Sequence, residues 1–215
     1  PWVTLKVASS ADGFIAPLSP NTSPPSKARR EAGGGAPAGG LRPSSDIFWI
    51  TRSEARAHSH WLRSRNDALL TGIGTVLADD PLLTCRLAGL EDRSPQRIVL
   101  DRQNRMPPTA KMLNDGAGEV WVLDSRFYIL DSVLSELANR GITRLMIEAG
   151  NRLNTAFMEL GLIDEIYWYR ATHLLHQGLP AFGVPIDLET KKTDSLTLDQ
   201  DTLSIYRLSS YTTNI

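Results

Sequence analysis

The segment at residues 67–86, which reads DALLTGIGTVLADDPLLTCR, contains the pattern that decides the fold. Its first apolar residues, 68–70, predict a short strand, and Gly72 and Gly74 predict a turn directly after it. The next half-dozen residues are expected to be helical and to end before Pro81, because proline has no N–H and disfavours helical geometry in the residue before it. The segment therefore predicts a strand, a turn, one or two helical turns and a new extended piece.

The turn at Gly72 and Gly74 has two interpretations. Glycines after a strand let backbone N–H groups approach a ligand closely, and the helix start that follows carries a partial positive charge, which suits phosphate. The alternative is an ordinary glycine turn. The match to the dinucleotide-binding fingerprint is weak because Leu77 stands where a third glycine belongs, and Pro81 leaves no room for a full crossover helix. The local sequence leaves both interpretations open.

The composition indicates one domain with a substantial core. The chain has 215 residues, of which 41% are apolar, and a net charge of −1. This balance gives no reason to expect binding to nucleic acid or to a membrane. The 18 arginines outnumber the 5 lysines. Arginine binds phosphate well, so a phosphorylated small molecule is one explanation, and compositional drift of the genome is another.

Several further features bound the possible functions. Cys85 is the single cysteine, so no internal disulfide is possible, and we expect it to be a small core residue. No run approaches the ~20 apolar residues of a membrane span, and no signal peptide is visible. His58 and His60 are two residues apart and do not share a helix face, so we expect surface histidines and not a metal pair. The chain begins at Pro1 with a strand-like segment, which predicts that an upstream segment has been cut away.

The first part of the chain alternates between order and a polar insertion. Residues 2–8 predict a strand with Val3, Leu5 and Val7 on one face and Lys6 on the other. Asp12-Gly13 is a strong turn pair. Residues 17–44 contain six prolines and five glycines and almost nothing apolar. We expect this stretch to be a disordered insertion, with a mobile lid as the alternative, and to be dispensable for folding.

The remaining elements predict a mainly parallel sheet. A helix is expected from a cap at Thr51 or Ser53 to about Arg65. Its inward stripe is Ala55, Ser59 and Leu62. Strands are expected at 97–101, 119–123, 144–147, 164–169 and 203–208. Helices are expected at 129–140 and after Gly150, the latter with an inward stripe of Leu153, Ala156, Phe157 and Leu160. Strands that alternate with helices predict an α/β fold with helices on both faces of the sheet.

Glu148 to Gly150 form the second informative turn. It follows a strand at the carboxyl edge of the sheet, where open α/β sheets bind ligands. Gly150 and the helix start after it suit a second phosphate. Glu148 is either a carboxylate of the site or an ordinary charge partner of the helix N-terminus. We expect it to face Lys6 across the site; the alternative for Lys6 is a solvated strand residue.

Together these pieces resemble the pyrimidine reductase of riboflavin biosynthesis. This reductase is usually the C-terminal half of a bifunctional deaminase–reductase and has a fold like that of dihydrofolate reductase. The matching residues are Val3–Lys6 with Asp12-Gly13, Trp49–Thr51, Leu62-Arg63, Thr75–Pro81 with Leu83-Thr84 and Arg86, Arg97–Asp101, Glu148–Gly150 and Gly161–Glu165. They cover residues 2 to about 170 in the family's order, and TVLADDP with a later EAG and GLIDE is a specific pattern. The resemblance implies a single reductase domain over residues 1–215, with the deaminase half absent.

The resemblance also implies the ligands and their residues. The cofactor would be NADPH, and the substrate 5-amino-6-(5-phosphoribosylamino)uracil, whose ribose is reduced to a ribityl chain. The implied cofactor residues are Ala8, Trp49, Gly72, Thr75, Asp79, Arg102, Gly150, Asn151, Arg152, Leu153, Asn154, Thr155 and Ala156. The implied substrate residues are Ile47, Arg63, Leu83, Arg86 and Glu148. Lys6 and Glu148 would be the catalytic pair, no metal is needed, and the enzyme would be a cytoplasmic homodimer.

This chain departs from the family pattern at several places. Ile47 stands where the family has a small hydroxyl residue at the substrate. Arg102 replaces a common serine at the adenosine end of the cofactor, where we expect it to face a 2′-phosphate and favour NADPH over NADH. The insertion at 17–44 is longer than the usual loop. Residues 151–155 are bulkier than usual, and 173–178 lack a second glycine.

The expected chemistry is hydride transfer, in which the cofactor carries the hydride and the protein supplies position and charge. Lys6, Glu148 or water would deliver the proton, and the sequence does not choose among them. Arg63 and Arg86 flank the same turn from opposite sides, so we expect them to bind the substrate phosphate. Local pairing does not explain their charge. Three alternatives stay open: a degenerate homologue that binds NADPH without turnover, a reductase of another pterin or ketone, and a non-enzymatic dimerisation partner.

Overall fold

The computed structural model describes residues 1–17, 49–124 and 129–208. Ile47 and the insertion, apart from residue 17, lie outside these ranges, so the expectations for them stay predictions. The strands are β1 (Trp2–Ser9), β2 (Phe14–Ala16), β3 (Ala68–Gly72), β4 (Gln96–Leu100), β5 (Val120–Leu123), β6 (Arg144–Ile147), β7 (Glu165–Arg170), β8 (Leu179–Pro180), β9 (Lys192–Leu198) and β10 (Asp201–Arg207). The α-helices are α1 (Ser53–Ser64), α2 (Ile73–Asp79), α3 (Lys111–Asn114), α4 (Leu130–Asn139) and α5 (Asn151–Glu159), with single 3-10 turns at η2 (Glu91–Arg93) and η3 (Glu189–Lys191).

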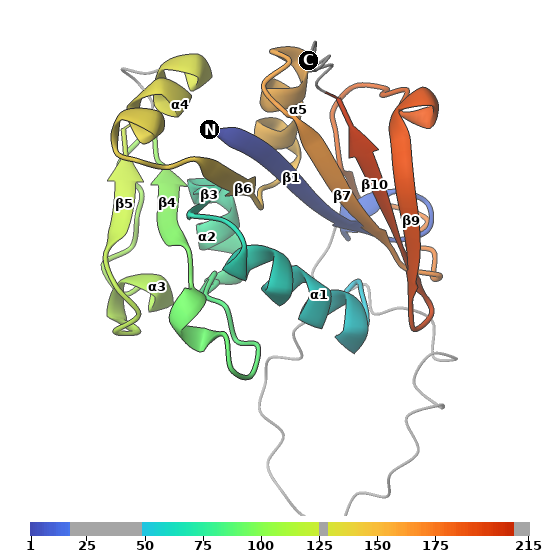
Figure 1. The fold of residues 1–215 in the computed structure, drawn as a ribbon, viewed down its shortest axis with the longest axis horizontal. Coiled ribbons are helices and arrows are strands. Elements are labelled where there is room, and N and C mark those ends of the chain that lie inside the picture. Colours follow the sequence, from blue (N-terminus) through green and yellow to red (C-terminus); the bar gives the residue numbers. More distant parts are fainter. Residues whose placement is uncertain (18–48, 125–128, 209–215) are drawn as a thin grey trace, which may run out of the picture.

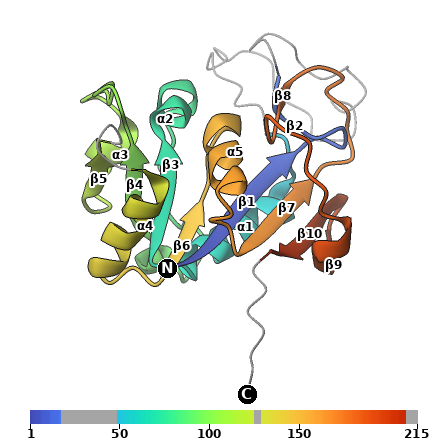
Figure 2. The ribbon, with the colours of Figure 1, turned by 90° about the horizontal axis from the view of Figure 1, so that it is seen from above.

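The main sheet has eight strands in the order β5-β4-β3-β6-β1-β7-β10-β9, which can be followed from one side to the other in Figure 2. The first six strands of this order run parallel, and β10 and β9 add an antiparallel edge. A second, two-stranded sheet pairs β2 with β8. The prediction of a mainly parallel α/β sheet is therefore confirmed, while β2, β8 and β9 were not anticipated.

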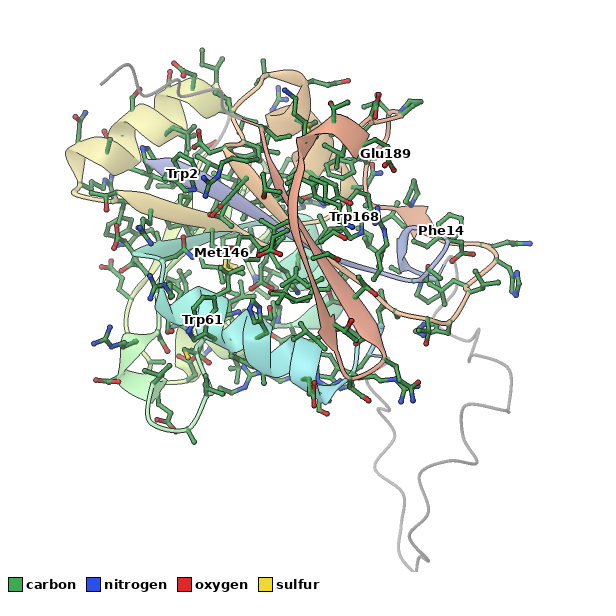
Figure 3. All side chains as sticks on the ribbon, turned by 45° about the vertical axis from the view of Figure 1, so that its right-hand side comes forward. Trp2, Phe14, Trp61, Met146, Trp168 and Glu189 are labelled. Atoms are coloured by element: carbon green, nitrogen blue, oxygen red, sulfur yellow. The ribbon has the colours of Figure 1, made fainter. Side chains whose placement is uncertain are left out.

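Helices cover both faces of the sheet, as predicted. Alternate residues of each strand point to opposite faces. On one face, Leu5, Leu70 and Ile147 share a core with residues of α4 and α5. On the other, Leu69, Val99 and Met146 share a core with residues of α1, α2 and α3. Figure 1 shows α4 and α5 on the side of the sheet opposite α1, and Figure 3 shows Met146 near the centre of the molecule, where it is fully buried.

The central segment folds as its sequence indicates. The strand β3 is buried, and α2 is only seven residues long. It ends at Asp79, and the C-cap residue Asp80, directly before Pro81, has a left-handed backbone with φ of 42°. Leu83 also has a positive φ of 57°, and its side chain is buried. The chain therefore turns sharply twice within four residues and returns along α1 toward β4 through an extended piece.

Two local expectations were wrong. Helix α1 has Arg52 at its N-cap position with no side-chain hydrogen bond, so neither Thr51 nor Ser53 caps it. The Asp201 carboxylate accepts a hydrogen bond from the Arg52 N–H instead (2.6 Å), so a distant strand supplies the acceptor at this end of the helix. Leu160, expected in the core stripe of α5, lies just after the helix end and is 59% exposed.

Candidate active site

Glu148 is the centre of a largely buried charged cluster. It directly follows β6, and its neighbour Ile147 pairs with Leu5 of β1, so the next residue along β1, Lys6, comes within reach. The Glu148 carboxylate is 3.5 Å from Lys6 Nζ. It also accepts two hydrogen bonds from Arg63 in the last turn of α1, from Nε at 2.6 Å and from Nη2 at 3.0 Å. The expected Lys6–Glu148 contact is thus present, and Arg63 joins it.

The charges around Glu148 decide its protonation. Burial by itself would raise the pKa of this carboxyl, but the positive charges and hydrogen bonds of Arg63 and Lys6 lower it to about 2. Glu148 is therefore a carboxylate at neutral pH and holds no proton to give. Of the three proton sources that the sequence left open, the Lys6 ammonium and water remain.

Arg63 is not available in the way the sequence suggested. Besides its two hydrogen bonds to Glu148, it donates from Nη1 to the Thr84 carbonyl oxygen at 2.8 Å. Only 11% of its side chain is exposed. Local pairing indeed does not account for its charge, because the partner, Glu148, lies 85 positions along the chain. What differs from the expectation is that Arg63 binds a carboxylate of the protein itself. The geometry makes Arg63 a clamp that joins α1, the Glu148 turn and the segment after Pro81.

Arg86 lies beside this clamp but is exposed. Its backbone N–H donates to Nδ1 of His60 at 3.2 Å. Burial, followed by the charges of Arg63 and Arg86, lowers the pKa of His60 to about 4, so this ring is neutral and can accept. The expectation of surface histidines is wrong: His58 and His60 are both half-buried and both hydrogen-bonded. Leu83, expected at the substrate, has its side chain in the core next to α1.

The two glycine-led helix starts lie side by side. A Cβ built on Gly72 would be 3.7 Å from Leu153 Cδ2, so the turn after β3 packs against the first turn of α5. A Cβ on Gly74 or Gly150 would meet no protein atom within 4 Å, so both glycines border open space. Neither α2 nor α5 has a side-chain cap at its N-terminus. We call Gly72, Gly74 and Gly150, with the helix starts beside them, the glycine rim. The backbone N–H groups at these helix starts have no side-chain cap, which suits the diphosphate of a dinucleotide.

The polar side chains of α5 are engaged elsewhere. Asn151 Nδ2 donates to the Pro180 carbonyl oxygen at 2.9 Å, and Asn154 Nδ2 donates to that of Ala181 at 3.2 Å. The Gly183 N–H donates to Thr155 Oγ1 at 2.8 Å. These bulkier residues therefore fasten the segment 180–183 onto α5. What α5 can offer a cofactor is the backbone at its start and the exposed Arg152.

The other predicted cofactor residues are spread around this rim. Thr75 and Asp79 lie one turn apart on α2, and Ala156 is half-buried on α5. Arg102 is exposed just after the carboxyl end of β4. Thr75 and Arg102 follow the carboxyl ends of β3 and β4, whereas Asp79 and Ala156 lie farther along their helices. No hydrogen bond ties Arg102 to a described residue.

Two predicted cofactor residues lie nearer to α1. Trp49 is 54% exposed, and the Arg56 guanidinium lies over its ring at 5.0 Å. Ala8 is half-buried on β1, two residues after Lys6 and paired with Tyr169 of β7. Ala8 is thus on the same strand as Lys6, whereas Trp49 lies beside Arg56 of α1.

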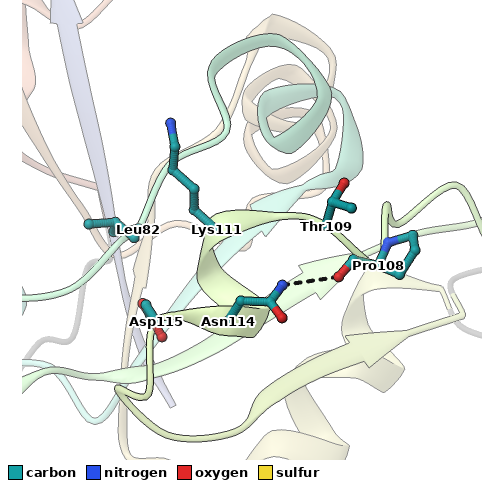
Figure 4. A pocket seen from close by; sticks show the side chains of 6 residues that line it. All are labelled: Leu82, Pro108, Thr109, Lys111, Asn114 and Asp115. Atoms are coloured by element: carbon teal, nitrogen blue, oxygen red, sulfur yellow. Dashed lines mark hydrogen bonds between the residues drawn. The ribbon is translucent and has the colours of Figure 1, made fainter.

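Two hollows of the surface lie away from the Glu148 cluster. One, of about 470 Å³, is lined by residues around α3, including Thr109 and Asn114, whose Nδ2 donates to the Pro108 carbonyl oxygen (Figure 4). Another, of about 480 Å³, lies at the amino ends of β1, β6 and β7. Ligand sites in open parallel sheets lie at the carboxyl ends of the strands. We therefore assign the site by its charged cluster and glycine rim and not by cavity size.

Among residues 1–17, 49–124 and 129–208, no group of three or more His, Cys, Asp or Glu side chains is arranged to hold a metal ion. None of the helices in these ranges is long and apolar enough to cross a membrane. Sequence reasoning missed Tyr169, whose ring lies 5.9 Å from Lys6 Nζ. Its only sequence signal was membership of an aromatic strand, which ordinarily indicates core packing.

Comparison with known proteins agrees with this geometry. A family described as the RibD C-terminal domain matches residues 38–204. Riboflavin biosynthesis protein RibD of Bacillus amyloliquefaciens is 31% identical over 198 residues, which cover 81% of this chain and 46% of that protein. The 2,5-diamino-6-ribosylamino-4(3H)-pyrimidinone 5′-phosphate reductase of Methanothermobacter thermautotrophicus is 32% identical over 189 residues, which cover 73% of this chain and 87% of that protein. The chain spans about half the length of several RibD relatives.

Solved structures give the same result. The structure of Acinetobacter baumannii RibD superimposes with a TM-score of 0.74 at 31% identity and covers 97% of this chain and 58% of that one. The riboflavin biosynthesis reductase Rib7 of Saccharomyces cerevisiae, at 19% identity and a TM-score of 0.66, covers 97% of this chain and 90% of that one and supports the fold alone. The fold is dihydrofolate reductase-like, as the resemblance implied. With the family match covering most of its length, this chain belongs to the RibD C-terminal domain family.

Proposed function

We propose that this chain is an NADPH-dependent reductase of riboflavin biosynthesis that converts the ribose of 5-amino-6-(5-phosphoribosylamino)uracil into the ribitylamino product. The observation that carries the proposal is the buried Lys6–Glu148–Arg63 cluster, which lies at the carboxyl edge of the sheet together with the uncapped glycine-led start of α5. A relative from Thermotoga maritima, 26% identical with a TM-score of 0.74, is described as a diaminohydroxyphosphoribosylaminopyrimidine deaminase and 5-amino-6-(5-phosphoribosylamino)uracil reductase.

The residues at the glycine rim fit a nicotinamide cofactor. Gly74 and Gly150 leave room for close approach, and the backbone N–H groups at the start of α5 are suitable donors to its diphosphate. Thr75 lies on the helix that starts beside this rim. When bound, such a cofactor supplies the hydride, while the protein supplies position and charge.

Lys6 is proposed to act on the reacting sugar. Its ammonium can donate a hydrogen bond to the sugar oxygen or nitrogen that gains negative charge as C1′ is reduced, and can pass a proton to it. Glu148 supplies a negative charge 3.5 Å from this ammonium, since the pKa of its carboxyl is lowered to about 2. Arg63 holds the second carboxylate oxygen, so the carboxylate does not rotate away. The pair therefore supplies a donor next to a fixed negative charge.

The phosphate of the substrate is proposed to bind Arg86. Its guanidinium is exposed, whereas the Arg63 guanidinium donates hydrogen bonds to Glu148 and to the Thr84 carbonyl oxygen. The hydrogen bond from the Arg86 N–H to His60 fixes the backbone from which this guanidinium projects. A bidentate arginine–phosphate contact is a strong and directional one. We therefore revise the two-arginine grip to one in which Arg86 binds phosphate and Arg63 orients Glu148.

The preference for NADPH is proposed to come from Arg102, an exposed cation after the carboxyl end of β4. We also propose a homodimer, which is supported by the strand β9 at the edge of the sheet, because an edge strand offers unpaired backbone groups to a second chain. Sedimentation of the purified chain tests this assembly. A cytoplasmic location agrees with the proposed soluble cofactor and substrate.

The test is turnover of NADPH with two purified substrates. One is the uracil compound, and the other is 2,5-diamino-6-ribosylamino-4(3H)-pyrimidinone 5′-phosphate, the compound named for the Methanothermobacter relative. Oxidation of NADPH with the uracil compound, and formation of the ribityl product by mass spectrometry, are expected. Turnover of only the diamino compound would reassign the substrate. Binding of NADPH with no turnover of either compound would favour the degenerate homologue. The observation that supports this alternative is that the polar side chains of α5 are hydrogen-bonded to residues 180–183.

A further inference from the structure

Lys6 has a second neighbour besides Glu148. The ring of Tyr169, on the adjacent strand β7, lies under the Lys6 ammonium with 5.9 Å from Nζ to the ring centroid. Tyr169 is fully buried and packs against Ala55 of α1 and Leu203 of β10. Aromatic rings at this distance attract a cation through their negative face. The ammonium is thus held between a carboxylate and an aromatic ring.

The Tyr169 ring is itself fixed at its hydroxyl. His58 Nδ1 lies 2.8 Å from the Tyr169 hydroxyl oxygen, which is hydrogen-bond distance. Burial lowers the pKa of His58, and burial together with the negative charge of Glu148 raises the pKa of Tyr169. Both groups are therefore neutral at neutral pH and share one hydrogen. Helix α1 thus locks the orientation of a ring that belongs to the sheet.

From this geometry we infer that Tyr169, anchored by His58, is a positioning residue that holds the Lys6 ammonium at the reacting sugar. The inference rests on the proposed function for the identity of the reaction. The Lys6–Glu148 contact is long, at 3.5 Å, because Arg63 already occupies both carboxylate oxygens. A lysine side chain has four flexible methylene groups, so one long contact leaves it freedom. The contact with the aromatic face adds a second restraint on the ammonium.

The first test compares two substitutions at the same position. Tyr169→Leu removes the ring, and we expect kcat to fall about 3- to 30-fold, the range that a partly desolvated cation–π contact covers. Tyr169→Phe keeps the ring and loses only the hydrogen bond between the hydroxyl and His58, so this variant should retain most of the wild-type kcat. The KM for NADPH should stay within about 2-fold in both variants, because Tyr169 does not lie at the glycine rim.

Tyr206 supplies a matched control. It is also buried, and its hydroxyl accepts a hydrogen bond from Arg170 Nη1 at 3.2 Å on the other face of the sheet. Tyr206→Leu and Tyr206→Phe remove the same atoms from the core but leave Lys6 untouched. If the Tyr206 variants lower kcat as much as the Tyr169 variants do, or if Tyr169→Phe is as impaired as Tyr169→Leu, the positioning role is overturned.

A second measurement does not need catalysis. Reductive methylation of the folded protein, read for each lysine by mass spectrometry, reports how restrained each ammonium is. In the wild type we expect Lys6, whose side chain is 19% exposed, to react more slowly than Lys111, which is 63% exposed. Tyr169→Leu should raise the methylation rate of Lys6 at least about 3-fold and leave that of Lys111 unchanged. Tyr206→Leu should change neither rate. An unchanged Lys6 rate would refute the positioning role even if the reductase assay succeeds, and a failed reductase assay leaves this readout intact.

Discussion

The Glu148 cluster and the glycine rim lie at the same edge of the sheet but are built in opposite ways. The cluster consists of side chains from β1, α1 and the turn after β6, which are buried, charged and paired with each other. The rim consists of backbone, and the polar side chains beside it are bound to the segment 180–183. A charge change should therefore damage the cluster, whereas added bulk should damage the rim. Substitutions in each region test this difference.

The largest effect is expected for Glu148→Gln. The amide removes the negative charge that Arg63 and Lys6 share, and both largely buried cations are left without this counter-charge. Loss of one partner from a buried ion pair costs about 3–5 kcal/mol, and a displaced catalytic group costs roughly 100-fold in kcat. Chemical denaturation and steady-state kinetics measure the two losses, while the Kd of NADPH should change little. A kcat close to that of the wild type would remove Glu148 from the chemistry.

Acid denaturation of the same variant tests whether Glu148 is stabilised as a carboxylate by its cationic partners. The pKa of Glu148 is lowered from 4.5 to about 2 in the folded protein. A lowered carboxyl pKa stabilises the fold above the unfolded-state pKa, and this stabilisation is lost as pH falls toward the folded-state pKa. The difference in unfolding free energy between the wild type and Glu148→Gln should therefore shrink between about pH 4.5 and pH 2. A difference that is constant with pH would contradict the charge pairing.

Arg86→Ala and Arg63→Ala should separate binding from structure. Arg86 is exposed, so its loss should leave the melting temperature nearly unchanged and raise KM for the phosphorylated substrate roughly tenfold, since a charge-assisted bond contributes about 1.5–3 kcal/mol. Dephosphorylated substrate should be poor for the wild type and little worse for Arg86→Ala. Arg63→Ala should instead lower stability and kcat. Equal ratios of the two substrates in the wild type and Arg86→Ala would place the phosphate elsewhere.

Gly150→Ala tests the rim. The backbone at Gly150 is extended with φ of −81°, and a Cβ there meets no protein atom within 4 Å, so the stability cost should stay under about 1 kcal/mol. The added methyl group would instead meet a bound cofactor and raise the Kd of NADPH about tenfold. Gly161→Ala is the converse control. Gly161 lies far from the rim, and its φ of 64° strains any side chain, so this substitution should lower stability and leave the Kd of NADPH unchanged. An unchanged Kd in Gly150→Ala would show that the cofactor does not approach this turn.

The smallest effect is expected for Arg102→Ala. An exposed ion pair contributes about 0.2–1 kcal/mol, so the preference for NADPH over NADH should narrow about 2- to 5-fold. Fluorescence titration of both cofactors measures the ratio, and the exposed Arg105 provides the matched control substitution. Equal binding of both cofactors by the wild type would show that Arg102 does not read the 2′-phosphate.

Much of the architecture was readable from local pattern. The apolar run of β3, the short α2 ended by Pro81 and the alternation in β1 follow from short-range sterics and hydrophobic periodicity, so each appears where the sequence predicts it. The pair of Lys6 and Glu148 was also inferred, because parallel strands present their carboxyl ends at one edge. The edge strand β9 was missed because its residues are mostly polar and exposed, so no hydrophobic pattern marks it.

Only the tertiary structure decided the roles of the side chains around the site. Arg63 and Glu148 are 85 positions apart, and no local rule tells that their charges neutralise each other. The asparagines of α5 bind carbonyl groups some 27 to 29 positions away, and the hydroxyl of Tyr169 lies against a histidine 111 positions away. Periodicity specifies which face of an element is buried, because that depends on neighbours along the chain. Which donor meets which acceptor depends on how the helices dock on the sheet, and this docking is set by contacts between residues that are distant in the sequence.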